Sequence, residues 1–501
     1  MENAAFLPIA PEVVLLIGAL LVLLSAVGFD RGRVESGIIA GLTIVIAFLF
    51  SVLQWRTLDS DGSAGELFFS AREIPVIRTP MVVMDPYSAF AGMVIFAIAL
   101  VGLLAAWKLI STLGSRGAEF IVLVLLGVAG LHMMVMSGNL VMMFLGLETA
   151  SISFYVLAGF TRERSNSDEA AVKYFLLGSL ASAIFIYGAA LVFAGTGSTA
   201  FYGAGGIGEF LAGTIVTDPG ILLIGIALLV VGLSFKVAAA PFHEWAPDVY
   251  QGAPSGAVGL MAAGVKVAGF AALGRILIGA LPSQIDDWAP AVAVIAGVSM
   301  IVGSLLATVQ TDVKRVLAYS GVAHAGYILV AFVAGRAGIG SMWFYVSTYA
   351  FALLGAFAVA AVVAGSRRGR SSLDDWAGLS SRSPELAWAM LVLLLGMGGI
   401  PFTAGFIAKV SVFTVAAEAG YLWLVILALI TTVIALYAYL RVVTAMFMRS
   451  PVAVEAPGTA TAEPHPSGTT RVAVAVAVII TILFGIIPWP LLEIAREALP
   501  L

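Results

Sequence analysis

Residues 228–245 read LLVVGLSFKVAAAPFHEW, an apolar run with a lysine and a proline in its second half. The run belongs to a segment long enough to cross a membrane, but Pro241 removes a helical hydrogen bond five residues after Lys236. Carbonyl groups freed by such a break must face protein or water, because lipid offers them no partner. The stretch therefore predicts a broken membrane helix with a lysine beside the break.

A second stretch repeats this arrangement. Residues 393–413 read LLLGMGGIPFTAGFIAKVSVF, with Pro401 after two glycines and before Lys409. An ordinary proline kink is common in membrane helices and is the alternative interpretation of each break. Two breaks that each accompany a lysine are more typical of an ion path in a transporter.

The composition is that of a polytopic membrane protein. Of the 501 residues, 61% are hydrophobic and only 11% are charged, and the mean hydropathy is +1.06. No soluble domain has this balance. The chain has no cysteine, which excludes disulfides and thiolate-bound zinc or iron–sulfur clusters. The small net charge of −4 and the lack of a basic patch point away from nucleic acid.

Fourteen apolar segments are long enough to span about 30 Å of hydrocarbon, so we predict an all-α protein with about fourteen transmembrane helices. Their approximate limits are 11–29, 37–54, 86–107, 118–137, 139–160, 169–194, 220–242, 254–281, 289–310, 313–335, 338–365, 384–416, 421–448 and 471–490. The broken helices are the seventh and the twelfth, and a repeat of five helices inverts its second copy. The predicted organisation is one membrane domain, 1–501, made of helices 1–3 (1–117), a first five-helix repeat of helices 4–8 (118–281), an inverted second repeat of helices 9–13 (289–448) and helix 14 (471–490).

Connector charges predict the orientation. With the N-terminus outside, the inner connectors hold fourteen lysines and arginines and the outer connectors hold five. The inner set is Arg31, Arg33, Lys108, Arg116, Arg162, Arg164, Lys314, Arg315, Arg367, Arg368, Arg370, Arg382, Arg449 and Arg471. Because positive residues favour the cytoplasmic side, both termini are predicted to face outward.

Lysine is distributed differently from arginine. Four of the six lysines lie inside apolar runs, namely Lys173, Lys236, Lys266 and Lys409. Of nineteen arginines, only Arg275 and Arg441 fall in such runs, near their ends. A buried ammonium is costly in hydrocarbon, and lysine escapes that cost by releasing its proton, whereas arginine does not. The pattern favours proton movement.

Two other groups fit such a path. Glu148 lies midway along the fifth segment, where an ionised carboxylate needs a cationic partner or a proton. At ~4 Å from Lys236 the two charges would interact by about 4 kcal/mol at an effective dielectric of 20, so that opening the pair would switch the lysine. A static ion pair is the alternative. His324, midway along the tenth segment, titrates near neutral pH and is a relay candidate, although a lone histidine is more often a core residue. Lys173 is a further relay candidate, or else it reaches the inner surface.

The remaining ionisable residues carry weaker signals. We interpret His132 and His243 as structural, and Asp248 as a solvated connector residue. The chain has no phosphate loop, dinucleotide fingerprint, nucleophile elbow or cluster of metal ligands in its sequence. Covalent chemistry and metal binding are therefore not expected.

Four stretches resemble the antiporter-like membrane subunits of respiratory complex I, which are relatives of the Mrp-type cation/proton antiporters. They are LGLETASISFYVLAGF (145–160), LSFKVAAAPFHEWAPDVYQGAPS (233–255), DVKRVLAYSGVAHAGY (312–327) and GIPFTAGFIAKVSVF (399–413). The resemblance covers helices 4–13. It implies two inverted five-helix bundles with discontinuous helices 7 and 12. It also implies a glutamate on helix 5, lysines on helices 7 and 8 and an ionisable group on helix 12, positions occupied by Glu148, Lys236, Lys266 and Lys409.

Among these subunits, the chain resembles the N type, also called the ND2 type, of NADH-quinone oxidoreductase. M-type subunits carry glutamate on helix 12, where this chain has Lys409, and L-type subunits are longer and end in a lateral helix. Fourteen helices match bacterial N subunits, so the resemblance implies a prokaryotic plasma membrane.

The resemblance implies a proton-translocating subunit without redox cofactors. Glu148 would tune Lys236, Lys266 and His324 would relay protons across the centre, and Lys409 would exchange them with the outside. The expected partners are other complex I subunits, especially adjacent antiporter-like and small membrane subunits. Flavin, iron–sulfur clusters and quinone are expected in partner subunits and not in this chain. Two alternatives use the same sequence: an Mrp-type Na⁺/H⁺ antiporter subunit, and a passive structural subunit.

Overall fold

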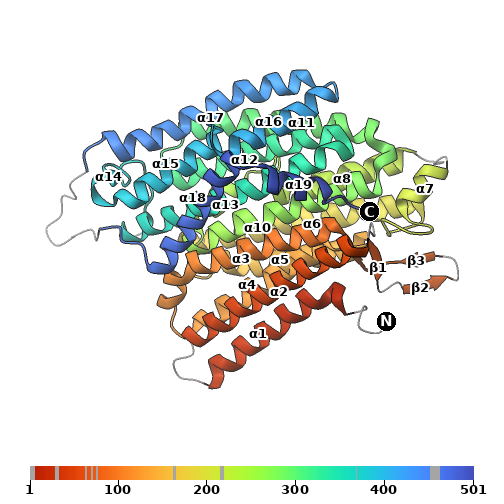
Figure 1. Cartoon of the computed structure of the whole chain (residues 1–501), viewed down its shortest axis with the longest axis horizontal. Helices are drawn as coiled ribbons and strands as arrows, with labels where there is room; N and C mark the ends of the chain where they lie inside the picture. The colour runs from red at the N-terminus through yellow and green to blue at the C-terminus, as the bar shows by residue number, and fades with distance from the viewer. Residues whose placement is uncertain are drawn as a thin grey trace.

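The computed structural model describes residues 6–28, 33–61, 65–68, 71–74, 77–161, 165–214, 219–367, 369–451 and 463–501. Four arginines of the predicted inner connectors lie outside the described residues, namely Arg31, Arg162, Arg164 and Arg368. Long apolar helices dominate the described part of the chain and pack side by side in one bundle (Figure 1). The prediction of an all-α membrane protein is confirmed at this level.

The first half of the chain supplies ten helices of very different length. They are α1 (Ala10–Gly28), α2 (Arg33–Asp61), α3 (Pro86–Thr112), α4 (Arg116–Val135), α5 (Leu140–Ala158), α6 (Ser165–Thr196), α7 (Ile207–Gly213), α8 (Pro219–Val237), α9 (Trp245–Gly252) and α10 (Ser255–Gly274). The second half supplies α11 (Ile285–Val309), α12 (Val313–Leu329), α13 (Ile339–Ser366), α14 (Leu379–Arg382), α15 (Pro384–Gly398), α16 (Ala404–Glu418), α17 (Leu422–Met448), α18 (Gly468–Ile486) and α19 (Trp489–Glu497).

Short strands occupy the connector between α2 and α3. β1 (Glu66–Phe68) pairs with β4 (Val82–Met84), and β2 (Ala71–Ile74) pairs with β3 (Ile77–Thr79), both antiparallel. These strands stand beside one end of the bundle (Figure 1).

Polar residues at the ends of apolar runs start several helices. Asp85 precedes α3, and its carboxylate accepts a hydrogen bond from the backbone N–H of Ser88, whose hydroxyl accepts one from the Asp85 N–H. Asn139 and Asp312 likewise cap α5 and α12. Each cap satisfies N–H groups that the first helical turn leaves free.

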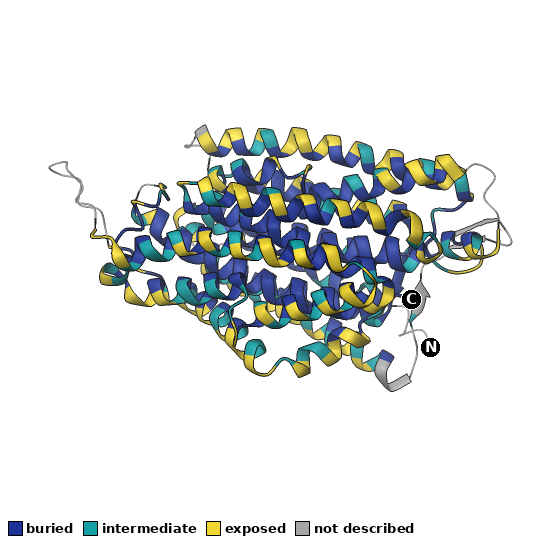
Figure 2. Ribbon diagram, turned by 90° about the horizontal axis from the view of Figure 1, so that it is seen from above, coloured by how far each residue is buried: buried dark blue, intermediate teal, exposed yellow. Residues whose placement is uncertain are grey.

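The helices follow one another across the bundle, from α1 and α2 at one edge to α17 at the other (Figure 1). α18 returns to the middle and packs against α3, α13 and α16. Buried residues occupy the interior, and exposed residues lie on the outer faces of the peripheral helices (Figure 2). Most large exposed side chains of α2, α6 and α17 are apolar, which suits a hydrocarbon surrounding.

Within the described residues, twelve helical runs are long and apolar enough to cross a membrane, against fourteen predicted segments. Two features account for the difference. α12 and α13 are joined by a 3₁₀ turn into one run, Val313–Ser366, although the chain turns at Gly335 with φ 58°. The predicted twelfth segment consists of two shorter helices, α15 and α16.

The structure interrupts the helix at each of the two prolines. Residues 238–244, which include Pro241, separate α8 from α9. Residues 399–403, which include Pro401, separate α15 from α16, and Gly399 has φ 81° there. The two interruptions place free carbonyl groups inside the bundle, where the buried lysines meet them.

Candidate functional site

Lys266, on α10, is bound to the first helix break. The residue is 1% exposed, and its Nζ donates hydrogen bonds to the carbonyl oxygens of Val237 at 2.5 Å and of Gly321 at 2.9 Å. In an unbroken helix the Val237 carbonyl would accept from the N–H of residue 241, but Pro241 has none. Lys266 supplies the missing donor and at the same time reaches α12.

Lys409, on α16, occupies the corresponding place at the second break. It is 5% exposed, its Nζ donates to the carbonyl oxygen of Gly398 at 3.0 Å, and it lies 4.8 Å from the centre of the Tyr327 ring. Gly398 ends α15, so its carbonyl is also left without a helical partner. Carbonyl and ring together stabilise a cationic amine without a carboxylate.

Lys236 lies in the last turn of α8 and faces α5. Its Nζ donates to the Ser151 hydroxyl at 2.7 Å and to the Tyr155 hydroxyl at 3.3 Å. A cavity of about 10 Å³ adjoins Lys236 and Ser151, close to the smallest volume that holds a water molecule. The amine therefore sits among hydroxyl groups that can pass a proton.

Glu148 is half-buried on α5 and points to a different neighbour from the one predicted. Its carboxylate accepts a hydrogen bond from the hydroxyl of Ser182 on α6. Both Glu148 and Lys236 are described, and no ion pair joins them, because the amine reaches Ser151 and Tyr155 instead. The expected direct contact is therefore not formed. Glu148, Ser151 and Tyr155 follow one another at three- and four-residue spacing, which places them on one face of α5.

His324 lies at the centre of a cluster of hydroxyl groups from three helices. It is 2% exposed, its Nδ1 lies 3.0 Å from the hydroxyl of Tyr345 and its Nε2 3.2 Å from that of Tyr439. The Tyr439 hydroxyl in turn lies 2.5 Å from the hydroxyl of Ser320. Both ring nitrogens thus have partners that can donate or accept a proton.

Tyr349 connects this cluster to Lys266. Its ring stacks on the His324 ring with the centres 4.1 Å apart. A Cβ atom added at Gly321 would lie 3.4 Å from Lys266 Cε and 3.5 Å from the Tyr349 hydroxyl. Both side chains therefore lie against the same glycine of α12, and among the described residues the buried Tyr349 hydroxyl has no hydrogen-bond partner. The glycine leaves room for both.

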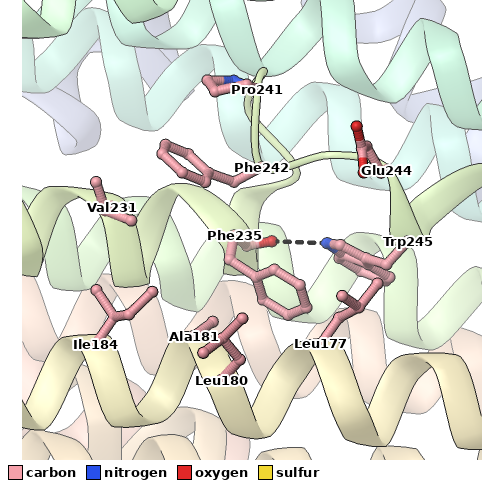
Figure 3. A pocket seen from close by; sticks show the side chains of 10 residues that line it. All are labelled: Leu177, Leu180, Ala181, Ile184, Val231, Phe235, Pro241, Phe242, Glu244 and Trp245. Carbon is pink, nitrogen blue, oxygen red and sulfur yellow. Dashed lines mark hydrogen bonds between the residues drawn. The ribbon is translucent and has the colours of Figure 1, made fainter.

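A pocket of about 150 Å³ opens beside the first break (Figure 3). Apolar side chains of α6 and α8 line one side, and Phe242 and Glu244 of the break line the other. Trp245 Nε1 donates to the carbonyl oxygen of Phe235 at 3.0 Å, which ties the start of α9 to the end of α8. Side chains thus hold the two halves together where the helical ladder is lost.

Lys173 lies apart from the buried amines. It is 42% exposed and forms ion pairs with Glu169 at 2.8 Å and with Asp248 at 2.7 Å. Arg315 also pairs with Asp248, at 2.6 Å. Asp248 is therefore a bridge between α6, α9 and α12 rather than the solvated connector residue that we predicted. The role of Lys173 in proton relay stays a prediction.

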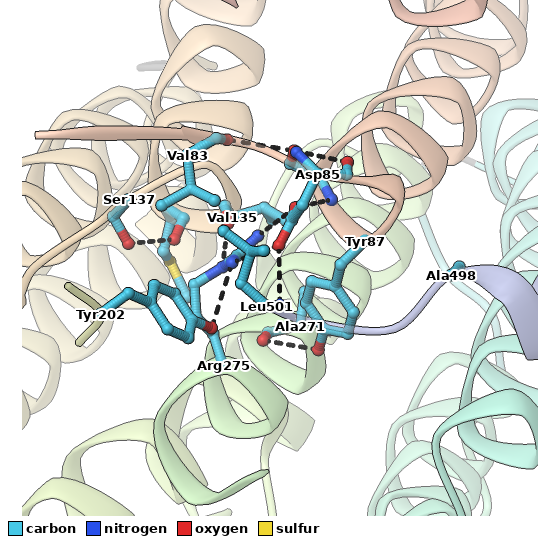
Figure 4. A network of polar contacts seen from close by, with 12 residues as sticks. Val83, Asp85, Tyr87, Val135, Ser137, Tyr202, Ala271, Arg275, Ala498 and Leu501 are labelled. Carbon is cyan, nitrogen blue, oxygen red and sulfur yellow. Dashed lines mark hydrogen bonds and ion pairs between the residues drawn. The ribbon is translucent and has the colours of Figure 1, made fainter. Parts of the chain in front are cut away.

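Arg275 forms a buried ion pair that the sequence analysis did not predict (Figure 4). Arg275 and Asp85 have no exposed side-chain surface, and two hydrogen bonds of 2.8 and 2.9 Å join them. Arg275 also donates to the carbonyl oxygen of Val135 at 2.7 Å and lies against the Tyr87 ring. An arginine is thus kept inside the bundle where a carboxylate neutralises it.

A second buried pair connects the first helix to α4. His132 Nδ1 is hydrogen-bonded to the Glu12 carboxylate, and both residues are buried. Among the described residues, His132 Nε2 and the Ser51 hydroxyl have no hydrogen-bond partner, and both lie close to Gly92. Glu12 lies on α1 and His132 lies on α4, so the pair joins these two helices.

Comparison with known proteins identifies this arrangement. Residues 137–435 match the family described as "NADH:quinone oxidoreductase/Mrp antiporter, TM". A protein named NADH-quinone oxidoreductase subunit N from Chloroflexus aggregans is 36% identical over 502 residues, covering 98% of this chain and 96% of that one. The chain belongs to the subunit N family of NADH-quinone oxidoreductase. Subunit N is an antiporter-like, proton-translocating membrane subunit of complex I, so the predicted family and function are confirmed.

Other relatives agree with this assignment. The subunit N of Mycobacterium tuberculosis is 42% identical over 391 residues, which cover 77% of this chain and 72% of that one. A chain of respiratory complex I from Thermus thermophilus with bound aureothin superposes with a TM-score of 0.77 at 31% identity, over 96% of this chain and 98% of that chain. A chain of the Mrp complex from Dietzia sp. DQ12-45-1b gives a TM-score of 0.84, over 99% and 97% of the two chains, but at 20% identity this likeness concerns the fold alone.

The hydroxyl groups that contact the ionisable residues were not predicted from the sequence. Tyr345 and Tyr349 are four residues apart on an apolar helix, which places both on one face and was the available signal. Tyr439, Ser151 and Ser182 had no such signal, because tyrosine and serine are common in membrane helices. Their contacts with the ionisable groups arise only in the folded bundle.

Proposed function

We propose that this subunit N moves protons along a buried row formed by Lys236, Lys266, His324 and Lys409, with Glu148 controlling entry. The observation that carries the proposal is the position of Lys266. Its Nζ binds the carbonyl of Val237, at the break of the first predicted repeat, and the carbonyl of Gly321, on α12 of the second. A single amine thus bridges the two halves of the subunit.

Entry involves the polar face of α5. Glu148 binds the Ser182 hydroxyl, and Lys236 binds the hydroxyls of Ser151 and Tyr155. Since Glu148 and Lys236 share no direct contact, the carboxylate acts on the amine through space and through Ser151, one turn along the helix. Protonation of Glu148 removes a negative charge near Lys236 and thereby favours release of the amine proton toward Lys266.

Transfer across the centre uses the tyrosine cluster. The Tyr349 hydroxyl lies beside Lys266, its ring stacks on His324, and the His324 nitrogens contact Tyr345 and Tyr439. Lys409 follows on the far side of Tyr327, on whose ring its amine lies. Lys409 exchanges its proton with the outside in this proposal, and Lys173 remains at the surface.

The architecture proposed for this path has fourteen transmembrane helices in two inverted five-helix repeats, with helices 7 and 12 discontinuous. α4 packs on α5 as α11 packs on α12, and each set contains one interrupted helix with a lysine-bound carbonyl, which supports the repeat. Both termini lie on the outer side of a prokaryotic plasma membrane. Adjacent antiporter-like and small membrane subunits are its neighbours, and flavin, iron–sulfur clusters and quinone belong to other subunits.

Substitution of Lys266 tests the proposal. Inverted membrane vesicles that contain complex I with Lys266→Met or Lys266→Arg should oxidise NADH with a strongly reduced proton gradient, because neither side chain releases a proton in the working range. Arg449→Met, at an exposed arginine, is the control and should pump normally. A normal ratio of protons to NADH in both Lys266 variants would leave the passive structural role as the better account.

A further inference from the structure

A cavity of about 480 Å³ opens at one end of the bundle and has no part in the proposed proton path. It lies where α3 and α13 end and where α4, α10 and α18 begin, and we call it the inner-end cavity. Its lining includes Lys108, Thr112, Arg116, Ser255, Gly365 and Thr470. The volume lies within the range of about 300–1,000 Å³ that small-ligand sites occupy.

The charges of the inner-end cavity are unbalanced. Among the described residues that line it, Lys108 and Arg116 are the cations and none is an aspartate or glutamate. Among the described residues, neither side chain forms an ion pair or a hydrogen bond. Other arginines at this end of the bundle do have acidic partners, as Arg370, Arg449 and Arg471 show. Two unpaired cations over a shared cavity favour an anion.

Helix ends add to this preference. α10 begins at Ser255 and α4 at Arg116, and no side chain caps either start. The free backbone N–H groups of a helix start favour negative charge and hydrogen-bond phosphate oxygens. The hydroxyls of Thr112, Ser255 and Thr470 supply further donors of the kind that bind phosphate.

The remaining walls are apolar. Leu109, Leu113, Ala361 and Val362 line the same cavity as the two cations. A free inorganic anion would gain nothing from these side chains, whereas a lipid would place its acyl chains against them. None of the described lining residues offers a carboxylate, which disfavours choline or ethanolamine, whose ammonium group needs a negative partner.

We propose that the inner-end cavity binds the phosphate headgroup of an anionic phospholipid, with Lys108 and Arg116 as its charged ligands. The lipid belongs to the leaflet at this end of the bundle, which is the cytoplasmic one under the orientation given in the proposed function. Binding there joins α3 and α4 to α10, α13 and α18, and so connects the N-terminal helices to the second half of the subunit. The binding site itself does not depend on the proton path.

The test measures bound lipid on intact complex I. The complex, purified in mild detergent and exchanged into mixed micelles of phosphatidylglycerol and phosphatidylcholine, is analysed by native mass spectrometry and by lipid extraction. Lys108→Gln and Arg116→Gln should each weaken phosphatidylglycerol retention roughly tenfold, as expected for the loss of a charge-assisted hydrogen bond. Arg449→Gln removes one positive charge at the same end, from an ion pair with Asp374, and should retain the lipid.

A second variant removes space and keeps both charges. A Cβ atom added at Gly365 meets nothing within 4 Å, so Gly365→Leu fits its helix and fills part of the cavity. It should also lose phosphatidylglycerol. Three results would overturn the proposal. Retention of the lipid by Gly365→Leu, together with loss in the charge variants, would show attraction by surface charge only. Equal retention in all variants would show that there is no site, and displacement of the lipid by millimolar inorganic phosphate would assign the site to a soluble anion. The readout is bound lipid, so a failure of the proton path leaves it unaffected.

Discussion

Lys409 Nζ lies 3.0 Å from the carbonyl oxygen of Gly398, the residue at which α15 ends. Lys266 makes the equivalent contact with Val237, at the end of α8. In both places a lysine from a helix that follows the break supplies the hydrogen-bond donor that the interrupted helix lacks. Lys266 lies on α10, and Lys409 lies on α16. In the proposed path the amine is both a proton carrier and a part of the local backbone structure, and variants can separate these two roles.

Replacement of Lys409 by arginine keeps the positive charge and the approximate length. Arginine holds its proton at any working pH, so we expect Lys409→Arg to assemble into complex I but to pump as poorly as Lys409→Ala. The measurement is the proton gradient per NADH oxidised in inverted vesicles, with a native gel to check assembly. Near-normal pumping by the arginine variant would show that Lys409 supplies a fixed charge.

Glu148 is expected to act on entry. Glu148→Ala should reduce both pumping and quinone-linked NADH oxidation without loss of assembly, and Glu148→Asp should keep more of both. Glu169, an exposed glutamate on α6, is the matched control, since Glu169→Ala removes the same charge at the surface. Ser182→Ala, which removes the partner of Glu148, should have an intermediate effect. Wild-type pumping by Glu148→Ala would exclude the proposed control.

Tyr439 offers a test of the hydroxyl cluster. Tyr439→Phe removes the hydroxyl between His324 and Ser320 and leaves the ring in place, so pumping should slow while the complex remains intact. Tyr437, on the same helix, is 59% exposed, and Tyr437→Phe serves as the control. If the two variants pump at the same rate, the Tyr439 hydroxyl is not on the proton path.

A lysine-to-arginine substitution also tests whether Lys173 takes part in proton relay. Because it is exposed and paired with Asp248 and Glu169, we expect Lys173→Arg to keep these ion pairs and to pump at close to the wild-type rate. Proton gradients in vesicles provide the measurement. Pumping reduced to the level of Lys409→Arg would instead return Lys173 to the relay that the sequence first predicted.

The Arg275–Asp85 pair should matter for stability rather than for transfer. Arg275→Met leaves Asp85 buried without its counter-charge, which should destabilise the folded subunit by about 3–5 kcal/mol. Thermal unfolding and native-gel assembly of complex I report this loss. The double variant Asp85→Leu/Arg275→Met should recover part of it, because an apolar pair avoids the uncompensated charge. No recovery would mean that the pair has a role beyond charge balance.

The sequence was sufficient for part of this structure. Proline in apolar runs predicted both helix breaks, and position inside an apolar run predicted the burial of Lys236, Lys266 and Lys409, because these effects follow from nearby sequence. It did not predict that Glu148 would bind Ser182, since the choice between two polar neighbours depends on how α5 and α6 rotate against each other. Residue type and spacing do not encode that rotation.

The Arg275 pair was missed for a different reason. Asp85 and Arg275 are 190 positions apart, and each lies at the end of an apolar run, where a charged residue is usually solvated. Their positions in the sequence therefore gave no indication that the two side chains meet. Only the three-dimensional packing of α3 against α10 brings them together and excludes water from them.

The lysine contacts at the two breaks have a mechanical consequence. A protonated amine donates stronger hydrogen bonds than a neutral one, so the charged lysine and the closed break stabilise each other. This coupling is reciprocal. Protonation of Lys409 strengthens the contact between α15 and α16, and a force that separates α15 from α16 weakens the binding of the proton to Lys409. Displacement of a neighbouring subunit by a fraction of a helical turn could in this way do work on Lys409 without touching it. The interrupted helices would then transmit to this chain the free energy that redox reactions release in other subunits.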